Sequence, residues 1–491
     1  MYLFDIIKMI QTAYIHVWEN VFYLNLLVAL AIIFSKKKDP ESAWAWIIFI
    51  HILPVMGIII YLLIGANIIK EKMFRAKAIN DQLHDIVEMQ ENSLSFHEMQ
   101  RISKNIEEYS DLIYYNLDTM SSVLSDNNTV THITEGKKKF ELLDQDIKNA
   151  KKFIHMQYYI IQDDMLFDHI ARELIAKAEQ GVEVRILFDS VGSRSITNEY
   201  CAHLEKYHIQ TGIFFEGFLR KFDYHMNYRN HRKIVVIDGD IGYVGGFNVG
   251  KEYLSLDKRF GHWRDTHMRI EGLAVSSLGI RFILDWNYTK KENLFAISMY
   301  TKMPRPTEGI SALQVISSGP DSTLPHIRDN YLRMISKATE SIHIQTPYFI
   351  PDEEIQTALL VAIHSGIKVH IMIPCKPDHP FVYWATRFYV GELVKAGAKC
   401  YTYEDGFLHS KGVIIDSRVY SYGTANFDIR SLHLNFEINV VNYSEEDAKD
   451  MVRLFEKDLE VCQEMTKEMY ANRGIKIRYK EQVSRLIAPI L

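Results

Sequence analysis

The sequence predicts an α/β protein with two α/β domains on mostly parallel sheets, related by a pseudo-two-fold axis, after an N-terminal transmembrane helical hairpin. Three observations lead to this prediction. A motif occurs twice with identical spacing, a strand–helix–strand pattern precedes each copy, and the N-terminal region is strongly apolar. The predicted segments are a two-helix transmembrane hairpin (1–69), a helical connector (70–130), a first domain (131–305), a second domain (306–465) and a basic amphipathic tail (466–491).

The repeated motif sets a histidine, a lysine, an aspartate and an asparagine at the same intervals in both halves. A short motif of common residues occurs by chance in a chain of 491 residues, but two copies that share every interval indicate a true repeat. The alternative, two basic hairpins on a surface, does not require this shared spacing. The first copy consists of His231, Lys233, Asp238 and Asn248, and the second of His409, Lys411, Asp416 and Asn426.

A second repeated unit lies upstream of each motif. Ile154–Ile160 resembles Ile342–Tyr348, and each is followed by a helix-like stretch. A glycine then opens another apolar segment, Gly181–Leu187 in the first half and Gly366–Met372 in the second. Strand, helix and strand in this order predict βαβ units with parallel strands.

The motif residues suit phosphodiester chemistry. Residues 234–237 are apolar and β-branched and predict a buried strand, so His231 and Lys233 face the same side. Asp238 falls in the following turn and is predicted to hold the hairpin, whose return strand brings Asn248 back beside the histidine. Histidine can attack phosphorus or carry a proton, while lysine and asparagine can hold phosphate oxygens.

Two such edges facing each other place one imidazole on each side of a single phosphorus. One would attack in line and the other would protonate the leaving alcohol. We expect no metal and no other cofactor, because Lys233 and Lys411 supply the positive charge. The four cysteines form no CxxC pair and give no sign of a metal site; they suit a reduced compartment.

A catalytic imidazole also needs an acid that orients it. Asp265 follows His231 by 34 residues, and Glu437 follows His409 by 28. Both acids are candidates for this role. The sequence leaves open the alternative that either one is a surface or structural carboxylate.

With these residues in view, the chain resembles the phospholipase D superfamily and, within it, the bacterial cardiolipin synthases. The matching stretches are Asn230–Gly239, Trp263–Asp265, Ser317–Asp321, Gln345–Asp352 and Gly423–Ser431. The resemblance implies two phospholipase D-like domains and a phosphatidyltransferase that converts two phosphatidylglycerol molecules to cardiolipin and glycerol through a covalent phosphatidyl-histidine. It also implies that His231 is the nucleophile and His409 the general acid and then base; pseudo-symmetry leaves the reverse assignment open.

Two other functions are compatible with the motif. A phospholipase D-type hydrolase or nuclease would resolve the same intermediate with water. A non-catalytic membrane protein could bind anionic lipid through a degenerate repeat, but both copies of the motif are intact. The net charge of −6 argues against a nucleic-acid partner, since such proteins need positive charge facing the phosphates. The expected partners are therefore phosphatidylglycerol and anionic membrane lipids.

The membrane prediction rests on two apolar stretches. Ala43–Ile69 is long enough to span a bilayer, and Asn20–Ser35 is shorter but is joined to it by the brief loop Lys36–Ser42. Five basic residues flank the pair and three lie in the loop, so the flanks and the catalytic region are predicted to be cytoplasmic. We thus expect a two-helix protein integral to the cell membrane.

The C-terminal tail from Thr466 carries six basic residues against two acidic ones, together with several aliphatic residues. This composition fits a helix that lies on an anionic bilayer. It fits equally well a helix packed on the second domain.

Overall fold

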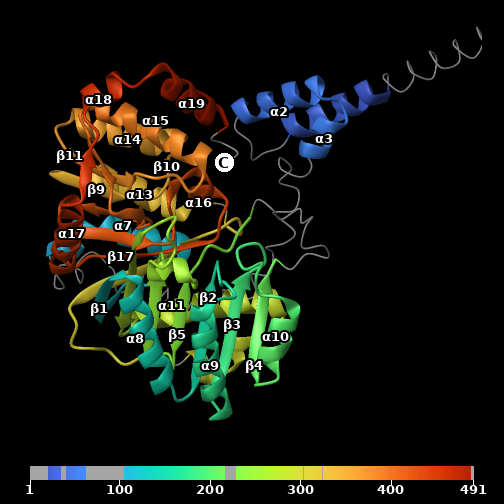
Figure 1. The fold of residues 1–491 in the computed structure, drawn as a ribbon, viewed down its shortest axis with the longest axis vertical. Helices are drawn as coiled ribbons and strands as arrows, with labels where there is room; N and C mark the ends of the chain where they lie inside the picture. Colours follow the sequence, from blue (N-terminus) through green and yellow to red (C-terminus); the bar gives the residue numbers. More distant parts are fainter. Residues whose placement is uncertain are drawn as a thin grey trace, which may run out of the picture. The chain divides into compact units, whose positions relative to one another are not determined.

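The computed structural model describes residues 20–34, 40–61, 104–215, 228–301, 304–322 and 324–487. The chain forms two units (Figure 1). One contains Met1–Lys77 and Phe222–Asn227, and the other contains Ala78–Lys221 and Tyr228–Leu491. Both copies of the motif lie in the second unit.

The described part of the first unit is helical. Residues 20–33 form one helix, followed by α2 (Pro40–Ile52) and α3 (Met56–Ile60). The Asn25 side chain donates to the Ile50 carbonyl at 3.0 Å, and Ala29, Ile32 and Ile50 pack together. None of the helices in these described segments is both long and apolar enough to cross a membrane.

The apolar stretch predicted as one span, Ala43–Ile69, is interrupted in the structure. The helix breaks between Ile52 and Met56, because Pro54 has no backbone N–H and Val55 takes a left-handed conformation with φ of 67°. Residues 62–69 and most of the predicted loop lie outside the described residues. The described helices of this region pack on one another, and the transmembrane hairpin stays a prediction.

The second unit is built on one continuous sheet in which both halves follow the same strand order. From edge to centre, the first half runs β4 (Ile209–Phe214), β3 (Glu183–Asp189), β2 (Phe153–Tyr158), β5 (Ile234–Ile237), β6 (Ile241–Gly245), β7 (His262–Glu271) and β1 (Ser125–Glu135). The second half runs β12 (Lys399–Tyr403), β11 (Lys368–Pro374), β9 (Ser341–Gln345), β14 (Gly412–Ile415), β15 (Val419–Gly423), β17 (Glu437–Asn442) and β8 (Ser311–Ser318). The halves join where β1 pairs with β8.

The prediction of mostly parallel sheets is wrong, because the sheet is mixed. Along the main strand order, the parallel pairs are those of the βαβ part of each half, which is β2–β3–β4 in the first and β9–β11–β12 in the second. The strands that carry the motif, β5–β6 and β14–β15, are hairpins and so must pair antiparallel. The βαβ pattern in the sequence predicts the parallel pairs correctly, but it does not apply to the motif strands, which pair antiparallel.

Two short strands extend the main sheet, and two others form a small separate sheet. β13 (Gly406–Leu408) pairs parallel with β7, and β18 (Cys462–Glu464) pairs antiparallel with β12. A separate two-stranded sheet joins β10 (Phe349–Ile350) to β16 (Phe427–Asp428). The pairing of β13 with β7 carries a strand of the second half onto the first half, directly before His409.

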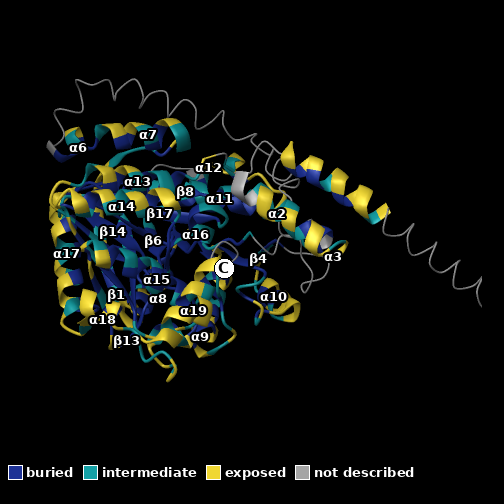
Figure 2. Cartoon of the chain, turned by 90° about the horizontal axis from the view of Figure 1, so that it is seen from above, coloured by how far each residue is buried: buried dark blue, intermediate teal, exposed yellow. Residues whose placement is uncertain are grey.

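Helices surround the sheet, whose strands form the buried centre of this unit (Figure 2). Side-chain caps fix several helix starts: Asp164 caps α9, Thr197 caps α10 and Asp352 caps α14. The helices are α8 (Gly136–Asn149), α9 (Met165–Glu179), α10 (Asn198–Glu205), α11 (Ala274–Lys290), α12 (Ser298–Thr301), α13 (His326–Lys337), α14 (Glu353–His364), α15 (Pro380–Ala396), α16 (Ile429–His433), α17 (Glu445–Leu459), α18 (Lys467–Ala471) and α19 (Ile475–Ile487).

The predicted connector is helical where it is described. α6 (Lys104–Glu108) and α7 (Ser110–Met120) pack Tyr109, Leu112 and Ile113 into the core of the second half. Strand β1 begins at Ser125, before the boundary predicted after residue 130. Residues 70–103 lie outside the described ranges, and the predicted domain limits stay predictions.

Candidate active site

Each motif hairpin is fixed by its aspartate. Asp238 adopts a left-handed conformation in the turn and accepts from the backbone N–H groups of Lys151, Lys152 and Phe153 at 2.7–3.0 Å. Asp416 does the same in the second half, with the backbone N–H groups of residues 339–341 at 2.7–2.8 Å. These bonds hold each hairpin to the start of the neighbouring strand in the sheet, which is β2 in the first half and β9 in the second. The hairpin-holding role of both aspartates stays a prediction, and these bonds are the contacts that it requires.

The two halves exchange their orienting acids. His231 Nδ1 lies 2.9 Å from Glu437 Oε2, and His409 Nδ1 lies 2.6 Å from Asp265 Oδ2. Each histidine is therefore paired with the acid that follows the other histidine in the sequence. The backbone shows the same exchange, because His231 N donates to Phe436 O at 2.9 Å and His409 N donates to Arg264 O at 2.7 Å.

This pairing sets the chemistry of the imidazoles. The carboxylate at Nδ1 assigns the proton to that nitrogen, which leaves the Nε2 lone pair available for attack or proton transfer. Glu437 is fully buried and also accepts from Thr424 Oγ1 at 2.5 Å. Asp265 is fully buried and accepts from its neighbour Thr266 N at 2.7 Å. The orientation of both rings is thus fixed by buried carboxylates that are held in turn.

The lysine of each motif is also buried. Lys233 Nζ donates to His231 O at 2.6 Å, Lys411 Nζ donates to His409 O, and Lys411 Nζ is 3.8 Å from Asp265 Oδ2. Burial lowers the pKa of Lys233 to about 7 and that of Lys411 to about 8. The positive charge of Lys411 also lowers the pKa of Lys233.

Burial and the lysine charges also lower the pKa values of the two histidines. Burial lowers the pKa of His409 to about 4, and the charges of Lys411 and Lys233 add to this effect while Asp265 opposes it. Burial also lowers the pKa of His231, with Glu437 acting in the opposite direction. Both imidazoles are therefore neutral near pH 7. A bound phosphodiester would oppose the field of the lysines and raise both histidine pKa values.

The two asparagines differ in their contacts. Asn248 is held at both ends, because its Oδ1 accepts from Ile160 N at 3.0 Å and its Nδ2 donates to Tyr253 OH at 2.8 Å. Asn426 Nδ2 donates to Asp428 Oδ2 at 2.9 Å, and its buried Oδ1 has no hydrogen-bond partner among the described residues.

Aromatic rings border both histidines. The ring of Tyr159 lies 4.9 Å from that of His231, and Lys233 Nζ lies 5.3 Å from the Tyr159 ring. On the other side, the Trp263 ring lies 5.1 Å from the His409 ring. Sequence reasoning did not identify Tyr159. Its position in the repeated Ile154–Ile160 unit is the signal that could have revealed it.

A buried aspartate in each half binds a glutamine and an arginine near the motif residues. In the first half, Asp285 accepts from Gln157 at 2.6 Å and from Arg232 at 2.7 and 2.8 Å. In the second, Asp458 accepts from Gln345 at 2.8 Å and pairs at 2.7 Å with Arg264, which comes from β7 of the first half. Arg232 also donates to the Glu437 carbonyl at 3.2 Å, which connects the two halves. Sequence reasoning missed Asp285 and Asp458, since nothing in their local sequence marks them.

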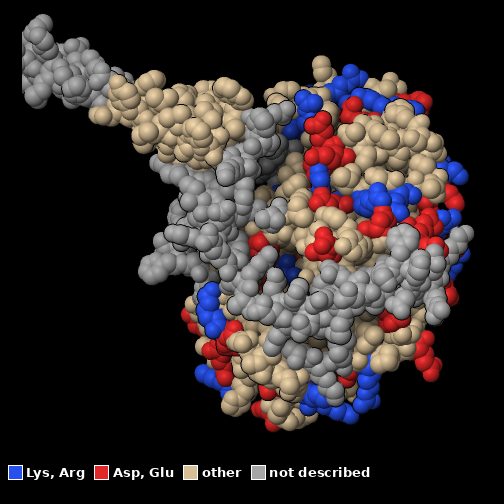
Figure 3. All heavy atoms as spheres, turned by 180° about the vertical axis from the view of Figure 1, so that it is seen from behind, with Lys and Arg blue, Asp and Glu red and all other residues tan. Residues whose placement is uncertain are grey.

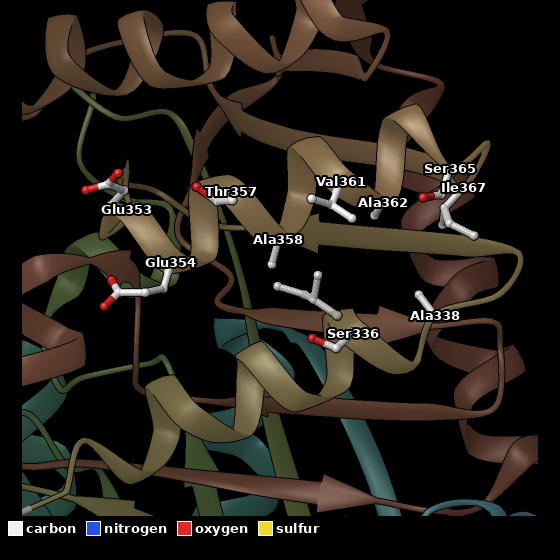
Figure 4. Close-up of a pocket in the computed structure, with 11 residues that line it drawn as sticks. Ser336, Ala338, Glu353, Glu354, Thr357, Ala358, Val361, Ala362, Ser365 and Ile367 are labelled. Atoms are coloured by element: carbon white, nitrogen blue, oxygen red, sulfur yellow. The ribbon is translucent and has the colours of Figure 1, made fainter.

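Other polar clusters and hollows lie away from the motif. Within the described segments, the residues that could hold a metal ion are Asp144, His169 and Glu173 on α8 and α9, and Lys148 Nζ already lies 2.7 Å from Asp144. A groove of about 690 Å³ runs between α13 and α14, lined partly by Ala358 and Val361, and no motif residue contributes to it (Figure 4). On the face seen in Figure 3, basic and acidic side chains are intermixed.

Comparisons with known proteins agree with this geometry. The family described as "Cardiolipin synthase, PLD-like domain" matches residues 143–259 and 331–459, one match for each half. The family "Phospholipase_D-nuclease N-terminal" matches residues 24–65, which include the N-terminal helices. These matches cover both copies of the motif.

Curated relatives match over almost the whole length. A cardiolipin synthase of Oceanobacillus iheyensis is 44% identical, over 96% of this chain and 98% of the relative. The major cardiolipin synthase ClsA of Bacillus subtilis is also 44% identical, with the same coverage of both chains. Among solved structures, phosphatidylserine synthase of Haemophilus influenzae superposes with a TM-score of 0.60 at 14% identity, covering 79% of this chain and 100% of that one. This likeness shows a shared fold.

Proposed function

Because this chain belongs to the cardiolipin synthase family of phospholipase D-like proteins, we propose that it transfers a phosphatidyl group from one phosphatidylglycerol to another, yielding cardiolipin and glycerol. The observation that carries this proposal is the exchanged pairing, His231 with Glu437 and His409 with Asp265. This exchange supports a single site to which each half contributes one imidazole and one buried lysine. Such a site can act on both sides of one phosphorus.

In the first step, Nε2 of His231 attacks the phosphorus of the first phosphatidylglycerol. His409 takes up a proton on Nε2 when the bound phosphodiester raises its pKa. The bond to the glycerol oxygen breaks, that oxygen takes this Nε2 proton from His409, and glycerol leaves. Glu437 stabilises the positive charge that develops on the phosphorylated imidazole. Lys233 and Lys411 hold the non-bridging oxygens, where negative charge accumulates in the transition state.

In the second step, a hydroxyl group of a second phosphatidylglycerol loses its proton to His409 and attacks the phosphorus. The bond between phosphorus and His231 breaks, and cardiolipin is released. His409 is thereby protonated again and ready for the next cycle, with Asp265 beside it to stabilise the imidazolium. Attack by water would instead give phosphatidic acid, so the acceptor decides between transferase and hydrolase.

The division of roles between the histidines can be tested by trapping the intermediate. Mass spectrometry of the purified protein, quenched during turnover of phosphatidylglycerol, should find a phosphatidyl group on His231. The matched variants are His231→Ala, which should carry no adduct, and His409→Ala, which should form one slowly. An adduct on His409 in the His231→Ala protein would reverse the assignment.

We also propose that the N-terminal helices are a two-helix membrane hairpin with the catalytic region in the cytoplasm. Support comes from large apolar side chains that face outward, among them Leu27, Phe34, Trp44 and Ile52, each 64–79% exposed. Five flanking basic residues against three in the loop favour cytoplasmic flanks. Protease treatment of intact and of opened cells should cleave the catalytic region only after opening; cleavage in intact cells would contradict this orientation.

A further inference from the structure

The C-terminal helix α19 packs on α15 with Glu481 and Ser484 directed inward. Glu481 and Ser484 are buried, at 0% and 1% exposure. Glu481 Oε2 lies 2.6 Å from Arg473 Nε, and the Arg473 guanidinium lies 3.5 Å from the Tyr470 ring. The only acidic side chain of α19 is thus buried and paired. This orientation is the reverse of that in an ordinary surface helix.

The outward side of α19 carries large apolar residues. Ile475 is 83% exposed, Tyr479 71% and Leu486 73%. These residues are four and seven positions apart, so they form a stripe along one face, opposite the face that holds Glu481 and Ser484. The helix begins at Ile475, four residues after the last residue of α18, and its exposed surface is visible in Figure 2. An apolar stripe on a solvent face marks an interaction surface.

Basic residues flank the stripe on both sides. Lys480 Nζ lies 4.8 Å from the Trp384 ring and the Arg485 guanidinium lies 5.0 Å from the Phe388 ring, so α15 holds both. Arg478 donates to Ala471 O at 2.6 Å, which fixes it at the start of the helix. Lys476 is a fourth basic residue on this helix. Because the one acid is buried, the exposed side is wholly positive.

The supporting helix α15 leads back to the active site. It begins at Pro380, two residues after Asp378, and Asp378 accepts from Tyr348 OH. The charge of Asp378 acts on Lys411 in the motif. Phe381, in the first turn of α15, is 52% exposed and adds an apolar side chain to this end of the unit. Helix α15, on which α19 packs, is therefore linked through Asp378 to the second half of the site.

We propose that α19 lies in the interfacial layer of an anionic lipid bilayer, with Ile475, Tyr479 and Leu486 inserted and the flanking basic residues at the headgroups. The combination of an apolar stripe and flanking positive charge fits anionic lipid headgroups. The choice of an anionic lipid rests in part on the proposed function, whose substrate is one. Docking through α19 would orient the catalytic unit toward the membrane that supplies both substrates.

The test measures how lipid protects the helix, independently of catalysis. A Tyr479→Cys variant of the full-length protein is reconstituted into phosphatidylcholine vesicles with or without phosphatidylglycerol. The rate of alkylation by a water-soluble maleimide is followed by mass spectrometry of the peptide that contains residue 479. Tyr114→Cys is the matched control, since Tyr114 is 52% exposed on α7.

We expect phosphatidylglycerol to slow alkylation at position 479 by about tenfold or more and to leave position 114 unchanged. High salt should reverse part of the protection. Equal rates in both kinds of vesicle, or equal protection of both positions, would overturn the proposal. Protection that depends on protein concentration and not on lipid would show a second copy of the chain on the stripe, and would also overturn it.

A second arm connects docking to turnover. Replacing Ile475, Tyr479 and Leu486 together by serine should slow turnover of long-chain phosphatidylglycerol in vesicles by about tenfold, with turnover of monomeric short-chain substrate unchanged. The matched control replaces Ile310, Tyr114 and Leu324, which are also exposed and of the same residue types. Equal loss on both substrates would contradict docking. Protection of position 479 in a protein that makes no cardiolipin would refute the proposed function alone.

Discussion

Replacing Glu437 by glutamine tests the exchanged pairing most sharply. The carboxylate accepts from His231 Nδ1 at 2.9 Å and from Thr424 Oγ1 at 2.5 Å, and it is fully buried. Glutamine keeps the shape and removes the charge. It also allows the amide N–H to face the ring, which would favour the wrong tautomer of His231.

The size of the effect follows from what is lost. A hydrogen bond to a charged group contributes roughly 1.5–3 kcal/mol, and the carboxylate also stabilises the positive phosphorylated imidazole. We therefore expect the barrier to rise by about 2–4 kcal/mol, which lowers kcat roughly 30- to 1,000-fold. KM should change little, since Glu437 does not contact the substrate in this mechanism. Thermal stability should be nearly retained, because the substitution preserves shape and removes a buried charge.

The assay is cardiolipin formation from phosphatidylglycerol in mixed micelles, combined with quantification of the adduct. In Glu437→Gln the amount of adduct on His231 should fall with kcat, because the first step is slowed. Asp265→Asn is the matched control at the other histidine, and it should slow both proton transfers while His231 remains the site of the adduct. A Glu437→Gln protein with wild-type kcat and a normal adduct would refute the reasoning.

Three further predictions follow from the same contacts. Asp238→Asn and Asp416→Asn each weaken several bonds to backbone N–H groups, so each should lower the free energy of unfolding by about 2–4 kcal/mol, measured by denaturant titration; an unchanged midpoint would contradict the hairpin-holding role. Activity should survive chelation with EDTA, because lysines supply the positive charge; loss that a divalent ion restores would count against this mechanism. Since the Lys233 and Lys411 pKa values are lowered to about 7 and about 8, the lysines lose their charge as pH rises through this range, so kcat/KM should fall on the alkaline side; a profile flat to pH ~10 would exclude this role for them.

Much of the site could be predicted from the sequence because the motif residues occur at the same spacing in both halves. The spacing of His231, Lys233 and Asp238 reports strand periodicity and a turn, which are local properties of the chain. The family and enzyme class are confirmed by relatives 44% identical over 96% of the chain. The acids were identified as candidates, but their exchange between halves was not, because intervals along one chain carry no information on which half a strand end will face.

The remaining errors and omissions have the same origin in tertiary structure. The sheet was predicted mostly parallel because the βαβ pattern is strong, whereas the hairpins make β5 and β14 antiparallel to their neighbours. Asp285 and Asp458 were missed because they lie on helices far from the motif and reach it only in the fold. The sequence of the C-terminal tail fits equally well a helix that lies on a bilayer and a helix that packs on the second domain. In the structure, the face of α19 that holds Glu481 and Ser484 packs on α15, and the apolar stripe faces outward.

Identification of the product made by the purified protein tests the central claim most directly. Phosphatidylglycerol labelled in both the acyl chains and the headgroup glycerol is supplied in vesicles, and lipid and water-soluble products are separated. The account predicts labelled cardiolipin and one free glycerol for each cardiolipin formed, with neither product in the His231→Ala protein. Phosphatidic acid with glycerol and no cardiolipin, or equal activity in His231→Ala, would contradict it.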